Sequence, residues 1–473
     1  MSRSLLIAAL LSLGLFGHGH AAERWERLDL PPAIAEASVS GLGAAQFPDG
    51  GIHPWVGTEQ GLYRRTAGGW QPWPDNGGPL RDITSIEFGP GPDGQTSWWL
   101  GSREGLWLFT PDSGLRRLTA DDSPLIEQPI NTLHFDQARG QGADLWIGGD
   151  GGLVIWQQGR WTPISARPDG FPGGQVRLFR RLAVDEHRER WVVSSEGLGR
   201  YVRGQWSRPA TECLRGRQPL SAETVELLGA LHLVVGTTRG LFLLDFEDTP
   251  ACRPIDITAH SEQAVAARAL VRDAEGRLYL FHDAGVERWH LDRSQVGHWT
   301  GFDERDGLDA DIEWTGPTHR DTDGTLWAGS TTGVWQFQPQ TAPTSRAPSI
   351  VVELNGERLS PGSNPVGLFT RSARIEVSSN EGQRAHAIRF ALSLNNQSVQ
   401  NQPLSWSTGR LERSVALPSG ESVLSVDVID AWGVMQGPFE YRLVRPSPLP
   451  WVILLFGLGL TAIVMAWLLR RHR

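Results

Sequence analysis

Eight polar residues occupy equivalent places in a phrase that recurs along the first two thirds of the chain. Each lies between a short apolar run and a glycine, and they are Glu59, Arg103, Glu104, Asp150, Glu196, Arg239, Asp283 and Thr331. Carboxylate and guanidinium groups near indole rings suit a polar, hydroxyl-rich ligand such as an oligosaccharide. We therefore expect these residues to bind a ligand.

Motifs for catalysis and for metal binding are missing from the sequence. The 13 histidines include no His-Glu-x-x-His pair, and no Gly-x-Ser-x-Gly elbow precedes a helix. His282 and Asp283 are neighbours, but such a pair is commonplace. We expect no catalytic residue, cofactor or metal. Two alternatives stay open: an exported enzyme of the propeller lyase or quinone-dependent dehydrogenase type, and a scaffold for a protein partner.

The spacing of the phrase predicts the fold. Its clearest copies are Trp55–Tyr63, Leu145–Leu153 and Leu326–Trp335, and seven copies are anchored at positions 57, 101, 148, 194, 236, 282 and 329. A period of this size is typical of radial or solenoid repeats. Apolar runs broken by glycine, with an Asp-Gly turn before and a Gly-x-Trp element after, indicate four strands per repeat. We predict an all-β chain with a seven-bladed β-propeller over residues 23–338.

The two ends of the repeat array complement each other. The last copy stops at Phe337, after its third strand, and Glu23–Leu28 resembles the Gly-x-Trp elements. We predict that this N-terminal segment supplies the missing strand, which closes the ring and removes two exposed sheet edges. The eight polar residues would then ring a central channel on one face. The long connections 163–181, 211–226 and 303–314 would wall a pocket there.

The rest of the chain divides into further segments. Residues 339–348 are rich in Pro and Thr and indicate a linker. About seven short alternating runs in residues 349–446 predict an immunoglobulin-like β-sandwich.

The two ends of the chain indicate its location. Residues 1–22 have the layout of a signal peptide. Trp451–Leu469 is an uncharged apolar run that would span roughly 29 Å as a helix, about one hydrocarbon core. We expect residues 450–469 to form a transmembrane helix, with residues 470–473 as an arginine-rich cytoplasmic tail. The protein would be a single-pass inner-membrane protein with a periplasmic bulk.

Charge and cysteine content narrow the list of partners. The net charge of −9 argues against nucleic-acid binding. Cys213 and Cys252 are the two cysteines, and the periplasm would permit a disulfide between them, although free thiols fit equally well.

In this order, the repeats, the sandwich and the membrane helix resemble the two-component regulator propeller sensors, which carry a Y-Y-Y-type sandwich. Trp55–Tyr63, Trp146–Ile155 and Trp327–Phe337 match the repeat of that family, and Leu417–Gly420 and Val426–Gly433 match later strands of its sandwich. The resemblance implies a periplasmic sensor that transmits the presence of a ligand across the membrane.

One departure from the family limits what the resemblance implies. Family members continue into a histidine kinase, a cyclase or a DNA-binding domain, and this sequence carries no phosphoacceptor helix or ATP-binding motif. Kinase activity is therefore not carried over. We expect a partner kinase, cyclase or other output protein, with a homodimer as a further option.

Overall fold

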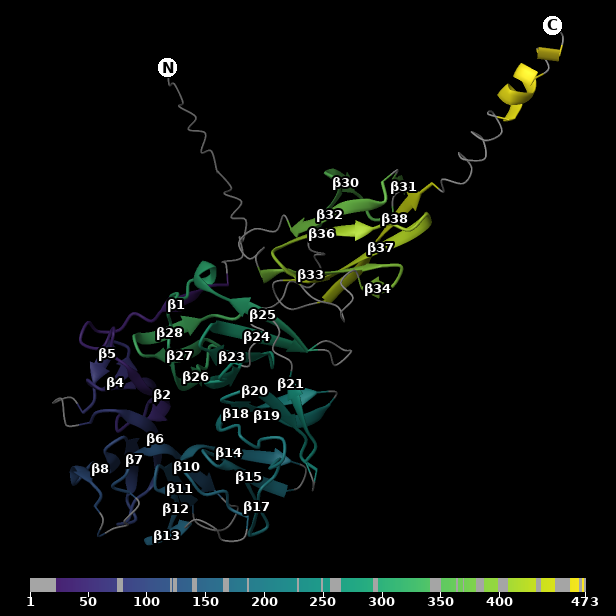
Figure 1. The fold of residues 1–473 in the computed structure, drawn as a ribbon. Helices are drawn as coiled ribbons and strands as arrows, with labels where there is room; N and C mark the ends of the chain where they lie inside the picture. The colour runs from purple at the N-terminus through teal and green to yellow at the C-terminus, as the bar shows by residue number, and fades with distance from the viewer. Residues whose placement is uncertain are drawn as a thin grey trace, which may run out of the picture.

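The described part of the computed structural model is almost entirely β-structure (Figure 1). The structure describes residues 23–471, apart from 75–79, 120, 122–125, 138–142, 165–169, 185–186, 228, 248–249, 256–264, 292–296, 341–349, 363–364, 369, 380–386, 399–406, 431–434, 447–459 and 468–469. Two parts follow each other along the chain, one built from β1–β28 and the other from β29–β38.

Strands β1–β28 form seven four-stranded antiparallel sheets within the described residues. In one of them β10 (Ile130–Gln137), β11 (Ala143–Gly149), β12 (Gly152–Gln157) and β13 (Arg160–Ile164) pair in chain order. Four more sheets follow the same order: β2 (Val39–Gln46), β3 (Ile52–Thr58), β4 (Gly61–Thr66), β5 (Gly69–Pro72); β6 (Ile83–Pro90), β7 (Thr96–Ser102), β8 (Gly105–Thr110), β9 (Gly114–Arg117); β14 (Val176–Val184), β15 (His187–Ser194), β16 (Gly197–Val202), β17 (Gln205–Ser207); β18 (Pro219–Leu227), β19 (Ala230–Thr237), β20 (Gly240–Leu244), β21 (Cys252–Ile255).

Two sheets complete the first part. One consists of β22 (Ala269–Arg272), β23 (Leu278–His282), β24 (Gly285–Leu291) and β25 (Gly297–Phe302). After the short 3-10 helix η1 (Glu304–Asp306), the other has the order β1 (Trp25–Arg27), β28 (Gly333–Phe337), β27 (Leu326–Ser330), β26 (Trp314–Arg320).

The first strands of the sheets surround a common axis. Each of these strands contacts the next one around the axis, in the order β2, β6, β10, β14, β18, β22 and β26. Strand β26 in turn contacts β2. Each sheet therefore extends outward from the axis, and these seven strands are the innermost ones. This radial arrangement is that of a β-propeller.

The N-terminal strand closes the ring, as the sequence predicts. Trp25 pairs with Phe337 and Arg27 with Trp335, so the outermost strand of this sheet comes from the other end of the chain. The Trp25 side chain is fully buried and stacks on Phe337 with ring centroids 4.9 Å apart. Burial of a large aromatic ring makes this pairing more stable than backbone hydrogen bonds alone would.

Aromatic side chains fill the space between neighbouring sheets. One apolar cluster joins Trp99 and Leu108 of one sheet to Ile147 and Trp156 of the next. The Trp99 and Trp156 rings lie 5.0 Å apart. Indoles suit these wedge-shaped spaces because they bury a large apolar area.

The second part, here called the two-sheet domain, encloses one apolar core. One sheet has the order β30 (Glu357–Leu359), β29 (Ile350–Leu354), β32 (Ser372–Ser379), β36 (Arg410–Ala416). The other has the order β31 (Val366–Gly367), β38 (Met435–Arg445), β37 (Gly420–Ile429), β33 (Arg389–Leu394), β34 (Gln397–Ser398), and β35 (Ser407–Thr408) also pairs with β33. Ile375 and Leu411 of the first sheet share the core with Phe390 and Val426 of the second.

Buried arginines link the two parts. Arg389, on β33 of the two-sheet domain, donates a hydrogen bond to the carbonyl of Trp299 on β25 at 3.1 Å. On the propeller, Arg277 donates to the carbonyl of Gln340 at 2.8 Å, where the chain leaves the last sheet. These contacts hold the two-sheet domain beside β24 and β25 (Figure 1).

A buried ion pair lies beside the closing strand. Arg288 Nη1 lies 2.7 Å from Glu23 Oε1, and both side chains are almost fully buried. Burial lowers the pKa of Arg288, but Tyr279 and Glu23 raise it above its ordinary value, so the guanidinium stays charged. The backbone N–H of Gln340 also donates to Glu23 Oε1, at 3.3 Å. Glu23 thus binds both the neighbouring sheet and the exit of the chain toward the two-sheet domain.

The terminal segments lie largely beyond the described residues. The predicted signal peptide, residues 1–22, and most of the predicted linker, residues 339–348, are among those not described. Of the predicted membrane segment, residues 460–467 are described, and they are helical. No helix in the described part of the chain is long and apolar enough to span a membrane.

We expect Glu23→Gln to destabilise the propeller by about 3–5 kcal/mol, because it removes the charged partner of a buried guanidinium. Chemical denaturation followed by Trp fluorescence measures the change. Asp309→Asn is the matched control, since it breaks the exposed Arg27–Asp309 pair, and it should cost below ~1 kcal/mol. Equal effects of the two variants would contradict a role for Glu23 in ring closure.

Candidate functional site

A cavity of about 550 Å³ lies on the axis of the propeller. The innermost strand of each of the seven propeller sheets contributes to its wall, for example Ser40 from β2, Thr84 from β6 and Thr318 from β26. The charged residues in the wall are Arg103, Asp150, Arg177 and Arg268. The central cavity is therefore mainly polar, with a surplus of positive charge.

In five of the seven propeller sheets, a shift in strand register aims one side chain at the cavity. The pairing of first and second strands skips Ser40, Thr84, Asn131, Arg177 and Leu220, each of which lines the cavity. Such β-bulges turn a side chain away from its regular direction. The bulges lie at the end of the first strand that adjoins the turn between the second and third strands. Each of these five sheets thus presents one bulged residue beside that turn.

Three of the bulged residues join their sheet to the next one. Ser40 Oγ donates to the Ile83 carbonyl at 2.9 Å, and Thr84 Oγ1 donates to the Ile130 carbonyl at 2.6 Å. Asn131 Nδ2 donates to the Val176 carbonyl at 3.1 Å. These bonds connect the inner strands around part of the ring, so the cavity wall is a hydrogen-bonded surface.

All eight residues predicted from the sequence lie in the two-residue turns between second and third strands. Arg103 and Asp150 line the central cavity. Asp283 forms an ion pair with Arg268, a lining residue, at 3.0 Å. Glu196 lines a different cavity, described below, and the remaining four, which line neither cavity, are Glu59, Glu104, Arg239 and Thr331. Equal positions in the repeat therefore do not bring all eight side chains to one site.

A buried hydroxyl holds most of these turns. In one sheet Thr237 Oγ1 donates to the Gly240 carbonyl at 2.9 Å and accepts from the Arg239 N–H at 3.0 Å. The same pair of bonds is made by the final residue of the second strand in four other sheets, namely Thr58, Ser102, Ser194 and Ser330. The next residue after each turn is a glycine with positive φ, for example Gly61 at 148°.

His282 takes the place of the hydroxyl in its sheet. Its Nδ1 accepts a hydrogen bond from the N–H of Ala284 at 3.1 Å, and the ring is 1% exposed. Its Nε2 lies 3.5 Å from Glu287 Oε1. His282 therefore positions a turn and faces away from solvent, so the His282–Asp283 pair is not a paired catalytic unit. Within the described residues, no group of three or more His, Cys, Asp and Glu is placed to hold a metal ion.

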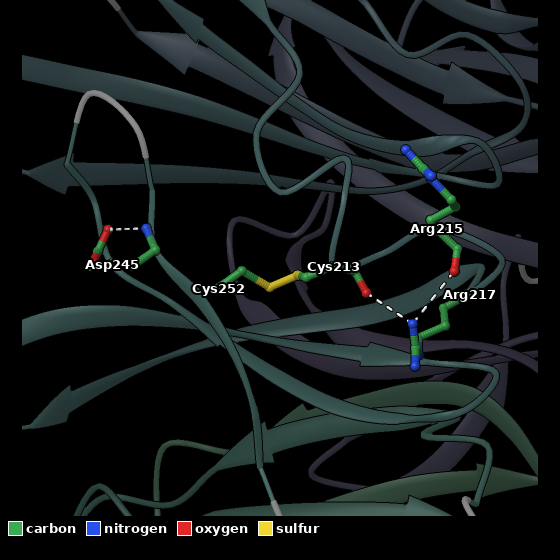
Figure 2. Close-up of a disulfide and its surroundings, with 6 residues drawn as sticks. Cys213, Arg215, Arg217, Asp245 and Cys252 are labelled. Carbon is green, nitrogen blue, oxygen red and sulfur yellow. Dashed lines mark hydrogen bonds between the residues drawn. A yellow bond between two sulfur atoms is a disulfide. The ribbon is translucent and has the colours of Figure 1, made fainter.

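A second cavity, of about 440 Å³, opens between two neighbouring sheets. Its wall includes Glu196 and the connection between β17 and β18, which carries Arg208, Arg215 and Arg217. Arg217 donates to the carbonyls of Cys213 and Arg215 (Figure 2). Arg208 donates to the carbonyl of Glu196. Part of the predicted 211–226 connection thus walls a pocket separate from the axis, whereas Leu220 of the same range lines the central cavity.

Cys213 and Cys252 form a disulfide with their Cα atoms 6.3 Å apart (Figure 2). It joins the connection that walls the second cavity to β21, the outermost strand of the next sheet. The disulfide attaches the connection to β21, and the C-terminal end of the connection continues directly into β18 of the same sheet. The connection is therefore attached to that sheet at two places.

The arrangement described above is a β-propeller with a polar axial cavity, followed by a two-sheet domain. No family model and no curated protein matches the chain. In fold it is similar to the extracellular domain of the hybrid two component system BT3049 from B. thetaiotaomicron, with a TM-score of 0.53 and 15% identity over 90% of this chain and 58% of that chain.

Two further similarities have lower scores. The extracellular domain of the hybrid two component system BT4673 from B. thetaiotaomicron has a TM-score of 0.49 and 12% identity, over 91% of this chain and 60% of that one. A virginiamycin B lyase from Staphylococcus aureus has a TM-score of 0.43 and 11% identity, over 67% of this chain and 99% of that one.

The structural neighbours of the chain include extracellular domains of two-component systems, as the sequence resemblance predicts. At these identities the similarity is one of fold. The chain spans less than two thirds of the length of the BT3049 and BT4673 domains.

We expect Thr237→Val to destabilise the propeller by about 2 kcal/mol, because the carbonyl of Gly240 and the N–H of Arg239 lose a buried partner. Denaturation midpoints measure the loss. Thr66→Val is the matched control: Thr66 makes the same two bonds in an exposed turn, and its loss should cost under ~0.5 kcal/mol. A cost for Thr237→Val no larger than the control's would show that the hydroxyl does not hold the turn.

Peptide mapping of the protein, purified without reductant, should recover the Cys213 and Cys252 peptides as one linked species. Added reductant should separate them. Recovery of both peptides alkylated, without prior reduction, would contradict the disulfide.

Proposed function

We propose that this chain is the periplasmic sensing part of a membrane signalling system, and that it binds a polar ligand, with oligosaccharides as the leading class, in the central cavity. The observation that carries the proposal is the cavity itself. Its wall combines hydroxyl and amide groups of the inner strands, such as those of Ser40, Thr84 and Asn131, with the charged side chains of Arg103, Asp150, Arg177 and Arg268. Concave sites with a few converging polar groups are where small ligands bind.

The proposal includes the finer architecture expected from the sequence. The seven four-stranded sheets would be the complete set of blades, closed by β1, and the two-sheet domain would be an immunoglobulin-like sandwich. The closed contact path from β2 around to β26 supports the first statement. Two sheets around one core support the second.

Attachment to the inner membrane through residues 450–469 is also part of the proposal. Among the described residues of that segment, Leu460, Ile463, Met465 and Trp467 are exposed apolar side chains on a helix. Arg471 lies over the Trp467 ring at 4.9 Å, a pairing suited to a membrane interface. Residues 1–22 would direct export, which would leave residues 23–446 in the periplasm and the C-terminus in the cytoplasm.

Signalling would require a partner output protein, such as a kinase or a cyclase. Arg389 of the two-sheet domain donates a buried hydrogen bond to the Trp299 carbonyl of the propeller. This contact supports transfer of a change at the propeller to the domain nearer the membrane. Pairing of two copies through that domain is the proposed form of the change.

Thermal unfolding of the full chain in detergent, with a panel of oligosaccharides, tests the function. We expect at least one saccharide to raise the unfolding temperature, and the rise to be lost in a variant carrying Arg103→Gln and Asp150→Asn. Glu59→Gln is the control, because Glu59 occupies an equivalent turn outside the cavity wall and should keep the rise.

Product analysis of the same mixtures separates sensing from catalysis. Unchanged saccharide supports a sensor, whereas turnover favours the enzyme alternative. A rise that persists in the Arg103 and Asp150 variant would move the binding site away from the central cavity.

A further inference from the structure

Charge in the central cavity is unevenly compensated. Arg268 pairs with Asp283 at 3.0 Å, and Asp150 accepts a hydrogen bond from Asn131 Nδ2 at 3.0 Å. The side chains of Arg103 and Arg177 form no hydrogen bond or ion pair with any residue that the structure describes. Two guanidinium groups therefore face the cavity without a protein counter-ion.

Arg177 differs from the residues at equivalent positions of other sheets. Ser40, Thr84 and Asn131 each use their bulged position to bind the carbonyl of the next sheet. Arg177 occupies the same bulge, between Val176 and Leu178, but its Nε is buried and has no partner in the described part of the chain. A guanidinium is always protonated, and a buried N–H donor without a partner is unfavourable.

Hydroxyl groups with free hydrogen-bonding capacity share the cavity wall. The Oγ of Ser85 and the Oγ1 of Thr315 are buried without a partner among the described residues, and both side chains line the cavity. Arg103 and Arg177 lie on the two sheets that flank the sheet of Asp150. The guanidinium groups of Arg103 and Arg177 and the two hydroxyl groups therefore line the same cavity.

We infer that the central cavity binds a carboxylate-bearing ligand, and that Arg177 pairs with the carboxylate through its guanidinium fork. This inference rests on the proposed function and adds the charge of the ligand to it. Arg–carboxylate pairs with two parallel hydrogen bonds are strong and directional. A bound carboxylate would supply the counter-ion that Arg177 lacks, while the hydroxyl groups bind polar atoms around it.

Isothermal titration of the full chain in detergent tests the inference with matched ligands. The probes are trigalacturonate, an alginate trimer and a hyaluronan tetrasaccharide, each beside its neutral methyl ester, together with citrate as a free organic acid. We expect at least one acid to bind ten-fold or more tightly than its ester, with an affinity that falls as salt is added. Tight binding of citrate alone would assign the carboxylate to a free acid instead of a saccharide, and would still support the inference.

Variants at Arg177 give the second arm. Arg177→Gln should weaken binding of the acid at least ten-fold and leave binding of the ester unchanged, with Arg177→Lys in between because it keeps the charge and loses the fork. Arg208→Gln, in the second cavity, is the control and should bind like the wild type. Without ligand, Arg177→Gln should unfold at the wild-type temperature or above, since it removes an uncompensated charge.

The outcomes separate the inference from the proposed function. Esters that bind as well as acids, in a cavity-dependent way, would overturn the inference and leave sensing intact. A fall in unfolding temperature for unliganded Arg177→Gln would make Arg177 a structural residue and would also overturn it. Failure of acids, esters and citrate alike would count against both.

Discussion

Closure of the ring is the constraint on which the rest of this structure depends. A radial set of sheets has two free edges until the first and last sheets are joined, and here one strand from the N-terminus pairs with β28. Trp25 packs against Phe337 and Phe281, and Glu23 binds the buried Arg288. Because every inner strand contacts two others only in a closed ring, the dimensions of the central cavity follow from this pairing.

Repeated local devices make the sheets alike, so that function depends on a few side chains. A buried hydroxyl, or His282 in its place, holds the turn after most second strands, and a bulge turns one side chain of most first strands toward the axis. The backbone of each sheet is thus a constant support. Asn131 and Arg177 occupy equivalent bulges of neighbouring sheets. Asn131 joins its sheet to the next one, whereas Arg177 brings a cation to the cavity on the same backbone support.

Among the described residues, the sheet β22–β25 makes a contact between the two parts of the chain. The sheet β22–β25 receives Arg389 from the two-sheet domain, and its β24 carries Arg288, the partner of Glu23. Ring closure and attachment of the two-sheet domain therefore share one sheet. A change in the packing of that sheet would reach both, which gives a physical route from the propeller to the segment nearer the C-terminus.

The sequence by itself determined the repeat, the four strands of each unit, the N-terminal strand that closes the ring and the turns that hold the eight polar residues. These features are local, because alternating apolar runs and glycine turns are set by neighbouring residues. The tertiary structure decided which polar residues share a cavity. Arg103 and Asp150 reach the axis whereas Glu59 does not, and Arg177 does so only through a bulge. It also joined Cys213 to Cys252, which the sequence left open. Side-chain direction at a bulge and distance across a ring depend on residues far apart in the chain, so spacing alone could not assign them.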